Sequence, residues 1–247
     1  MSFNLSGRTA LITGGAKRIG RSVALTLARA GANVVVNYRS SSREAEELVN
    51  EIKSLGRGAW AVRADLSVAE ELEGLVDEVI RNVGSFDILI NNASIFPETT
   101  FDEFTLNDLI GSIKIDAWAP VVLGRQFAQK IGKGHIVNMT DSRAVSYDWN
   151  HVAYHAAKYL LGLFTREMAI RFAPNIAVNA VAPGLILPPE GKDANYLECL
   201  KDRLPLKRIG KPEFVAEAVL YLVTSEFITG QVIFVDGGRH LTEVSIG

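Results

Sequence analysis

A tyrosine and a lysine four positions apart, Tyr154 and Lys158, are the side chains best suited to passing a proton. They lie at the start of a predicted helix, where the i, i+4 spacing puts both groups on one face. A phenol has a pKa of about 10, so a neighbouring ammonium group that lowers this pKa helps it to donate a proton at neutral pH. Such pairs also occur on ordinary helix surfaces, but the position of this one after the fifth predicted strand favours a catalytic role.

A glycine-rich turn, residues 13–20 with the sequence TGGAKRIG, follows the first predicted strand and leads into a helix. Glycines there let the backbone turn tightly and approach a pyrophosphate, and the free N–H groups of the helix N-terminus bind phosphate oxygens. The motif therefore predicts a dinucleotide site, with a plain tight turn as the alternative.

The end of the second predicted strand indicates which dinucleotide is bound. Sites that prefer NAD usually carry an acidic residue there, about 20 positions beyond the glycines, to bind the ribose 2′-OH. Residues 37–41 read NYRSS and contain no carboxylate. Arg39 and the hydroxyls beside it, helped by Lys17 and Arg18, suit the additional 2′-phosphate of NADPH. A solvated basic turn is the alternative.

The elements that must hold these residues alternate between short apolar or β-branched runs and longer segments of helical period, which predicts βαβ units. We expect a single α/β domain over residues 1–247: a doubly wound (Rossmann) sheet of seven mostly parallel strands with helices on both faces. Segment 184–211, rich in proline, glycine and charge, has no clear period and is expected to form a loop over the site. The predicted strands are Thr9–Thr13, Asn33–Asn37, Ala59–Arg63, Ile88–Asn91, His135–Met139, Ala177–Val181 and Val232–Val235, and the predicted helices span about 19–30, 42–55, 68–82, 102–130, 151–173 and 212–224, with left-handed caps at Gly31, Gly56 and Gly84.

The composition argues against several function classes. The 26 basic and 28 acidic residues leave a net charge of -2, and no basic block could hold a nucleic-acid backbone. Cys199 is the single cysteine and the four histidines lack zinc-ligand spacing, so neither a disulfide nor a metal site is expected. The N-terminus lacks the apolar core of a signal peptide, and no later run is long enough for a membrane span. We expect a cytoplasmic protein with a small-molecule substrate and neither nucleic acid nor membrane as partner.

Together these motifs resemble the short-chain dehydrogenase/reductase family over essentially the whole chain. The resemblance implies that Lys158 holds the nicotinamide ribose and that Tyr154 passes the proton. It also implies that Asp65 faces the adenine and that residues 91–93 support the sheet and the cofactor. The matching features are the loop at 13–20, Asp65-Leu66, Asn91-Asn92-Ala93, the Tyr154/Lys158 pair, Pro183-Gly184 and Val235-Asp236-Gly237-Gly238.

Two departures from the family pattern indicate a substrate class. Arg18 stands where the loop usually has glycine, and Asp141 stands where the family has its catalytic serine. With Phe96, in the run NNASIFP, they resemble the pteridine reductase branch, including the bacterial dihydromonapterin reductases. That resemblance implies that Phe96 stacks on the pterin ring and that Ser94 lies beside cofactor and substrate.

The chemistry of a pterin fits these residues. Asp141 could accept hydrogen bonds from an aminopyrimidine edge or relay a proton, Arg18 could reach the carbonyl edge, and Phe96 could sandwich the flat ring. The alternatives are that Asp141 caps a turn, that Arg18 only neutralises phosphate and that Phe96 belongs to the core.

A third departure lies in the middle of the chain. Related enzymes often carry an asparagine that supports a proton-relay water near the lysine, and Asp116 aligns with it here, where its charge could alter the pKa values of Lys158 and Tyr154. His151 and His155 flank Tyr154, and we expect them at the rim of the site or on the helix surface. Tyr147 and Trp149 are candidates for the pocket wall, with a core or interface role equally open.

We therefore expect an NADPH-dependent reductase that transfers hydride to a dihydropterin of the dihydromonapterin or dihydrobiopterin type, with dihydrofolate as a further candidate. The alternatives are an NADPH-dependent reductase of a carbonyl or 3-ketoacyl thioester, and a non-catalytic NADP(H)-binding sensor. The family resemblance alone implies a homotetramer. The predicted catalytic residues are Asp141, Tyr154 and Lys158; the predicted cofactor-binding residues are Gly14, Lys17, Arg18, Ile19, Gly20, Tyr38, Arg39, Ser40, Ser41, Asp65, Leu66, Asn91, Ala93, Ser94, Thr140, Tyr154, Lys158, Pro183 and Gly184; and the predicted substrate-binding residues are Arg18, Ser94, Phe96, Asp141, Tyr154 and Leu185.

Overall fold

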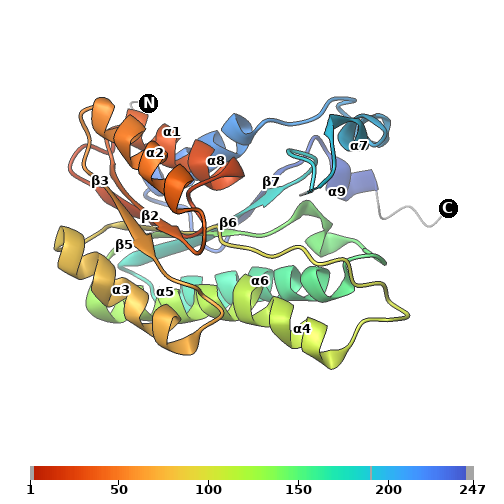
Figure 1. Cartoon of the computed structure of the whole chain (residues 1–247), viewed down its shortest axis with the longest axis horizontal. Coiled ribbons are helices and arrows are strands. Elements are labelled where there is room, and N and C mark those ends of the chain that lie inside the picture. Colours follow the sequence, from red (N-terminus) through yellow and green to blue (C-terminus); the bar gives the residue numbers. More distant parts are fainter. Residues whose placement is uncertain (1–2, 190, 243–247) are drawn as a thin grey trace.

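A parallel sheet forms the middle layer of the computed structural model, which describes residues 3–189 and 191–242 (Figure 1). Within these residues seven strands pair in the order β3-β2-β1-β4-β5-β6-β7, and every pairing is parallel. The chain order reverses between β1 and β4, which is where open α/β sheets place their ligands. The strands are β1 (Thr9–Ile12), β2 (Asn33–Tyr38), β3 (Ala59–Arg63), β4 (Ile88–Asn91), β5 (Gly134–Met139), β6 (Ile176–Pro183) and β7 (Val232–Val235).

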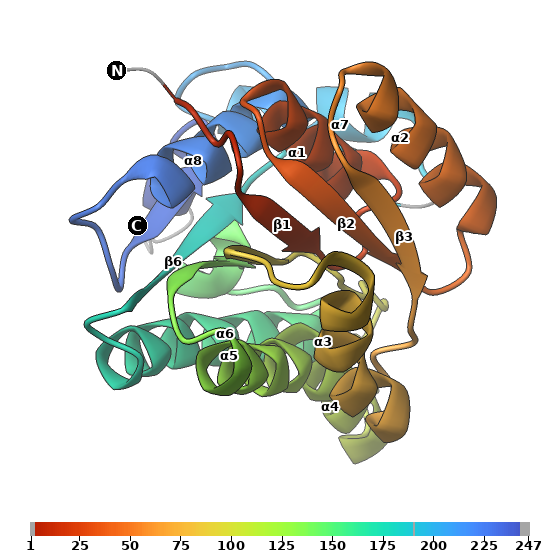
Figure 2. The ribbon, with the colours of Figure 1, turned by 90° about the vertical axis from the view of Figure 1, so that its left-hand side faces the viewer.

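Helices cover both faces of this sheet (Figures 1 and 2). One face carries α1 (Arg18–Arg29), α2 (Ser42–Ser54) and α8 (Pro212–Thr224), and the other carries α3 (Ala69–Val83), α5 (Ala119–Lys130) and α6 (Val152–Arg171). The remaining helical elements are α4 (Leu106–Ile113), the π-helical segment η1 (Lys114–Trp118), the 3-10 turns η2 (Ser142–Val145) and η3 (Lys201–Arg203), α7 (Ala194–Glu198) and α9 (Arg239–Thr242).

The strands are apolar on both faces because helices cover both. Along β1, for example, Ala10 and Ile12 belong to the core cluster beneath α1 and α8, whereas Leu11 belongs to the cluster beneath α3 and α5. The fold predicted from the sequence is therefore confirmed, with all seven strands at their predicted places and positive φ angles at Gly31, Gly56 and Gly84.

The predicted helix 102–130 is wrong in its start and in its continuity. It begins at Leu106, because the Thr105 side chain accepts a hydrogen bond from the backbone N–H of Asp108 and the Asp108 side chain bonds back to the N-cap. It is then interrupted by η1, whose π-helical turn separates α4 from α5.

Segment 184–211 has more structure than its sequence predicts. It contains α7 and η3, and its own small apolar cluster of Leu185, Leu197 and Leu204. Its residue Glu190 lies outside the described residues. Among the described residues, no helix is both long and apolar enough to cross a membrane, and no three His, Cys, Asp or Glu side chains group as metal ligands.

Candidate active site

The predicted site residues lie at the carboxyl ends of six strands and in the first two turns of two helices, along one edge of the sheet. This is the edge at which parallel α/β folds bind ligands. Gly14 to Gly20 join β1 to α1; Tyr38 to Ser41 follow β2; Asp65 and Leu66 follow β3; Asn91 to Phe96 follow β4; Thr140 and Asp141 follow β5; Tyr154 and Lys158 are on α6; and Pro183, Gly184 and Leu185 end β6.

The glycine-rich loop packs directly on the chain that follows β4. A Cβ atom on Gly14 would lie 2.9 Å from the Ala93 Cα, and one on Gly20 would lie 2.6 Å from the Asn92 Nδ2. Asn92 Nδ2 donates hydrogen bonds to the carbonyl oxygens of Thr13 (2.9 Å) and Gly14 (3.0 Å). Glycine is required at both positions because a side chain would push the loop away from its support.

The start of α1 suits an anion. No acidic residue lies in its first turn, and the side chain of Lys17 makes no capping hydrogen bond to it. Arg18 adopts the left-handed conformation, with φ at 55°. Its guanidinium donates to the Pro188 carbonyl oxygen (2.5 Å), so it ties the glycine-rich loop to segment 184–211. This backbone cradle is suited to the pyrophosphate of a dinucleotide, and binding by these residues stays a prediction.

Arg39 and Ser40 are exposed after β2, in the place predicted for a 2′-phosphate. Lys17 is less available for that role because its ammonium group lies 3.5 Å from Glu44. Asp65 accepts hydrogen bonds from Ser67, which lower the pKa of its carboxyl, and the positive charge of Arg39 lowers it further. Arg39 is therefore the predicted phosphate ligand with the clearest access.

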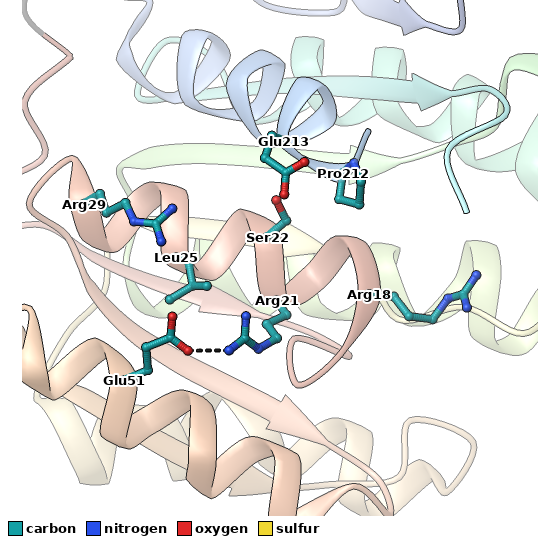
Figure 3. A pocket seen from close by; sticks show the side chains of 8 residues that line it. All are labelled: Arg18, Arg21, Ser22, Leu25, Arg29, Glu51, Pro212 and Glu213. Atoms are coloured by element: carbon teal, nitrogen blue, oxygen red, sulfur yellow. Dashed lines mark hydrogen bonds and ion pairs between the residues drawn. The ribbon is translucent and has the colours of Figure 1, made fainter. Parts of the chain in front are cut away.

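A charged hollow of about 260 Å³ lies between α1, α2 and α8, on the face of the sheet opposite α6 (Figure 3). Arg21 pairs there with Glu51, and the side chain of Arg18 points away from that pair. This hollow is separate from the predicted catalytic residues. Its lining consists of Arg18, Arg21, Ser22, Leu25, Arg29, Glu51, Pro212 and Glu213.

The predicted catalytic residues meet at the end of β5. The Tyr154 hydroxyl donates a hydrogen bond to Asp141 Oδ2 (3.0 Å), and Lys158 Nζ lies 5.5 Å from the Tyr154 ring centre. Lys158 Nζ also donates to the Met139 carbonyl oxygen (2.8 Å), which fixes the ammonium group at the strand end. The geometry confirms that these three predicted residues adjoin one another.

The predicted tuning of Tyr154 by Lys158 is corrected by the structure. Burial raises the pKa of Tyr154 well above its ordinary value, and the negative charges of Asp141 and Asp116 raise it further, against an opposing effect of Arg143. Lys158 Nζ lies 3.1 Å from Asp116, whose negative charge opposes its effect on Tyr154. Tyr154 is therefore a protonated hydrogen-bond donor at neutral pH.

Asp116 occupies the π-helical segment η1 and is completely buried. Its Oδ1 accepts a hydrogen bond from Ser94 Oγ (2.5 Å) and faces Lys158 Nζ, whereas its Oδ2 is buried without a hydrogen-bond partner. Burial raises the pKa of Asp116 in spite of the charge of Lys158 and the hydrogen bond from Ser94. The sequence placed Asp116 near the lysine, and the structure confirms that position.

Arg143 is a site residue that the sequence did not predict. It lies in η2, and its side chain reaches both Asp141 and Asp148 while remaining only 15% exposed. Burial alone would raise the pKa of Asp141, but the charge and hydrogen bonds of Arg143 outweigh that effect, so the pKa lies below its ordinary value. The only signal in the sequence is the spacing Asp-x-Arg, which has no fixed meaning by itself.

Phe96 is half-buried and belongs to neither of the two large core clusters, so the core alternative is wrong. Its ring stacks on the His151 ring (3.9 Å between centres) and meets the Tyr154 ring edge-on (4.8 Å).

Tyr147 and Trp149 are 74% and 63% exposed, which excludes a core role for them. His155 contacts the Arg143 carbonyl oxygen (2.6 Å) through its Nε2.

The remaining predicted residues act mainly through packing and backbone. The Asn91 side chain donates to Asn138 (2.8 Å), and Thr140 Oγ1 donates to the Val181 carbonyl oxygen (3.0 Å). Gly184 has no room for a side chain, because a Cβ would lie 2.6 Å from that of Asp236. Leu185 is buried in the small cluster of segment 184–211 and also lines a hollow of about 280 Å³ beside α9, so its contact with substrate stays a prediction.

Comparison with known proteins shows similarity over nearly the whole chain. The family model described as enoyl-(acyl carrier protein) reductase matches residues 14–240. Glucose 1-dehydrogenase 2 of Bacillus subtilis (strain 168) is 33% identical over 253 residues, with 98% of each chain covered. The 3-oxoacyl-(acyl-carrier-protein) reductase FabG of Staphylococcus epidermidis (strain ATCC 35984) is 34% identical over 251 residues, covering 95% of this chain and 99% of that enzyme.

Among solved structures, FolM alternative dihydrofolate reductase 1 from Brucella suis in complex with NADP superposes with a TM-score of 0.92 at 31% identity, covering 100% of this chain and 99% of that chain. The sheet order, the glycine cradle and the adjoining Tyr154 and Lys158 are thus accompanied by a sequence match over nearly the whole length. The chain belongs to the short-chain dehydrogenase/reductase family of oxidoreductases.

Proposed function

We propose that this oxidoreductase is an NADPH-dependent reductase of dihydropterins, of the dihydromonapterin or dihydrobiopterin type, with dihydrofolate as a further candidate substrate. The observation that carries the proposal is the hydrogen bond between Tyr154 and Asp141 (3.0 Å), formed beside the half-buried ring of Phe96. The family's serine hydroxyl suits a carbonyl oxygen, whereas an ionised carboxylate suits the N–H donors of an aminopyrimidine.

The reduction of a C=N bond requires hydride at carbon and a proton at nitrogen. A nicotinamide cofactor, held by the glycine-rich loop and Lys158, would supply the hydride. Tyr154 donates the proton from its hydroxyl, which its raised pKa keeps protonated until that step. Asp141 accepts N–H hydrogen bonds from the substrate, and Lys158, fixed by the Met139 carbonyl, holds the ribose. Phe96 stacks on the ring.

The preference for NADPH is supported by Arg39 and Ser40, which are exposed at the end of β2 without a neighbouring acid in residues 37–41. A guanidinium group binds phosphate through paired charge-assisted hydrogen bonds. The similarity to the Brucella suis FolM alternative dihydrofolate reductase 1 in complex with NADP supports both the pterin substrate and the NADPH preference.

A carbonyl or 3-ketoacyl thioester reductase is the second candidate, and the 34% identity to the staphylococcal FabG enzyme favours it. The replacement of the serine by Asp141 opposes it, because a carboxylate repels the developing negative charge on a carbonyl oxygen.

The decisive experiment follows NADPH oxidation by absorbance. The substrates are 7,8-dihydromonapterin, 7,8-dihydrobiopterin and dihydrofolate, beside an acetoacetyl thioester and a simple ketone. We expect turnover of the pterins, with a large advantage of NADPH over NADH. Turnover of the carbonyls alone would establish the second candidate, and NADPH binding without any turnover would favour a non-catalytic sensor.

Three variants test the assigned roles. Tyr154→Phe and Asp141→Ala should lose at least about 100-fold in activity, the lower range of a general acid's contribution, while NADPH binding is retained. Asp141→Ser restores the residue usual in the family and should gain ketone reduction as pterin reduction falls. Full activity in both of the first two variants would refute the mechanism.

A further inference from the structure

Arg143 connects two carboxylates beside the catalytic tyrosine. Its Nε lies 3.3 Å from Asp141 Oδ1 and its Nη2 lies 3.4 Å from Asp141 Oδ2, while its Nη1 pairs with Asp148 Oδ2. The backbone N–H of Arg143 donates to Asp141 Oδ1 as well (2.8 Å). Both oxygens of Asp141 are thereby fixed from one side, and the Tyr154 hydroxyl fixes Oδ2 from the other.

The same guanidinium lies against the aromatic residues. Its central carbon is 5.0 Å from the centre of the Phe96 ring and 6.0 Å from that of Tyr154. Asp148, which pairs with Arg143, also contacts His151 Nδ1 (3.2 Å). The His151 ring in turn stacks on Phe96. One cation therefore sets the positions of the carboxylate, the proton donor and the stacking ring.

The charges around Asp141 explain what would change without Arg143. Arg143 from η2 and Tyr154 from α6 contact Asp141 directly. The other charged or titratable groups lie one contact further away: Asp148 and His155 contact Arg143, Lys158 lies over the Tyr154 ring, Asp116 pairs with Lys158, and His151 contacts Asp148. Arg143 is the only cation in direct contact with Asp141 among these described groups. Its removal would leave a buried carboxylate whose desolvation is no longer offset, so the pKa of Asp141 would rise.

We infer that Arg143 is a positioning residue that keeps Asp141 ionised and oriented, and so makes the site select substrates that present N–H donors. This inference rests on the proposed dihydropterin reductase function. Substrate selectivity then depends on Arg143 as well as on Asp141, and Asp148 holds the other end of the Arg143 guanidinium.

The test compares Arg143→Gln with Arg143→Lys in dihydropterin reduction between pH 5 and 9. We expect Arg143→Gln to raise KM for the dihydropterin by about tenfold or more, since charge-assisted hydrogen bonds are lost, with a smaller change in kcat. The acid limb of kcat/KM should move to higher pH, because Asp141 then takes up a proton at higher pH. Arg143→Lys keeps the charge and should keep the acid limb near its original position.

Two further measurements separate this role from a merely structural one. Binding of the oxidised ring, 2-amino-4-oxopteridine, in the presence of NADP+ is followed by tryptophan fluorescence, and its Kd should rise by about tenfold in Arg143→Gln. Arg125→Gln is the matched control, because Arg125 also lies over an aromatic ring, that of Trp118 (4.8 Å), but on α5. It should change neither KM nor the pH profile.

The possible results lead to distinct conclusions. If Arg143→Gln folds and shows the original KM and acid limb, or if Arg143→Lys shifts the limb as far as Arg143→Gln, the inference is overturned while the proposed function stands. If Arg143→Gln does not fold, Asp148→Asn replaces it, and an unchanged KM in that variant overturns the inference. A wild-type enzyme that neither binds nor reduces a pterin overturns the proposed function and this inference together. The pH dependence of kcat/KM, measured for His151→Gln and His155→Gln, shows whether these histidines contribute to its acid limb.

Discussion

Substitution of Gly20 by alanine tests the tight contact on which the cofactor site depends. A Cβ at this position would lie 2.6 Å from both Asn92 Nδ2 and the Gly14 carbonyl oxygen, and 2.9 Å from the Gly15 Cα. Two of these three atoms are backbone, and Asn92 is held by its hydrogen bond to the Gly14 carbonyl (3.0 Å). The glycine-rich loop must therefore move by several tenths of an ångström, or this hydrogen bond must break.

The expected cost follows from these contacts. Overpacking of a tight site costs about 1–3 kcal/mol, and a lost hydrogen bond adds about 1 kcal/mol. Alanine in a helix gains about 0.5–1 kcal/mol over glycine, which offsets part of the cost. We expect Gly20→Ala to lose about 1–3 kcal/mol in the free energy of unfolding, measured with urea. The Kd for NADPH, measured by its fluorescence, should rise at least about tenfold because the displaced loop no longer approaches the pyrophosphate.

Gly74 provides the matched control. It also lies within a helix, α3, but a Cβ there would meet nothing within 4 Å. Gly74→Ala should therefore stabilise the protein by about 0.5–1 kcal/mol and leave NADPH binding unchanged. The reasoning fails if Gly20→Ala is as stable as Gly74→Ala and binds NADPH with the original Kd.

Four other outcomes are expected. Arg39→Gln should reduce the preference for NADPH over NADH in kcat/KM by about 10- to 100-fold, the effect of one or two charge-assisted hydrogen bonds, and an unchanged ratio would place the 2′-phosphate elsewhere. Asp116→Asn removes a charge that raises the pKa of Tyr154, so the basic limb of the pH profile of kcat should move to lower pH. An unchanged basic limb would show that Asp116 does not affect the pKa of Tyr154. Burial and the charge of Arg8 lower the pKa of His135 to about 4, so stability present above pH 6.5 should be lost by up to about 3 kcal/mol as the pH falls through 4, and His135→Gln should remove this loss in urea titrations. Light scattering should give about four times the chain mass of 26.9 kDa, as the family resemblance implies; such an assembly would cover apolar side chains that are exposed on α4 and α6, and a monomer would contradict this expectation.

The fold was predictable because its signals are local. Each strand is a short apolar run, such as Ile88–Asn91, and the glycines that end helices take the positive φ angles that favour glycine. The interruption of 102–130 was not predictable in this way. A π-helical turn changes the helical register by one residue, and the run Ile115, Asp116, Ala117 is compatible with an ordinary α-helix.

The catalytic groups were predictable for a different reason, since Tyr154 and Lys158 have a fixed spacing and a known place after β5. The partners of these groups were not. Arg143 reaches Asp141 only because the 3-10 turn η2 folds the chain back on itself, and Asp148 reaches Arg143 through a loop whose sequence, SYDWN, has no regular period. The pairing of Lys158 with Asp116 likewise depends on packing between η1 and α6, which lie about 40 residues apart in the sequence.

The two acidic departures from the family pattern act in the same direction on Tyr154. If the tyrosine lost its proton, its oxygen would lie 3.0 Å from the Asp141 carboxylate. The repulsion between two unit charges at that distance is about 5 kcal/mol for an effective dielectric constant of about 20. Arg143 offsets part of this repulsion, but Asp148 shares its charge, and Asp116 pairs with the ammonium group of Lys158 that would otherwise stabilise a tyrosinate. Oxidation of an alcohol needs a tyrosine that accepts a proton, whereas reduction needs one that gives it. The arrangement therefore keeps Tyr154 protonated in the resting site and opposes its use as the base that alcohol oxidation needs.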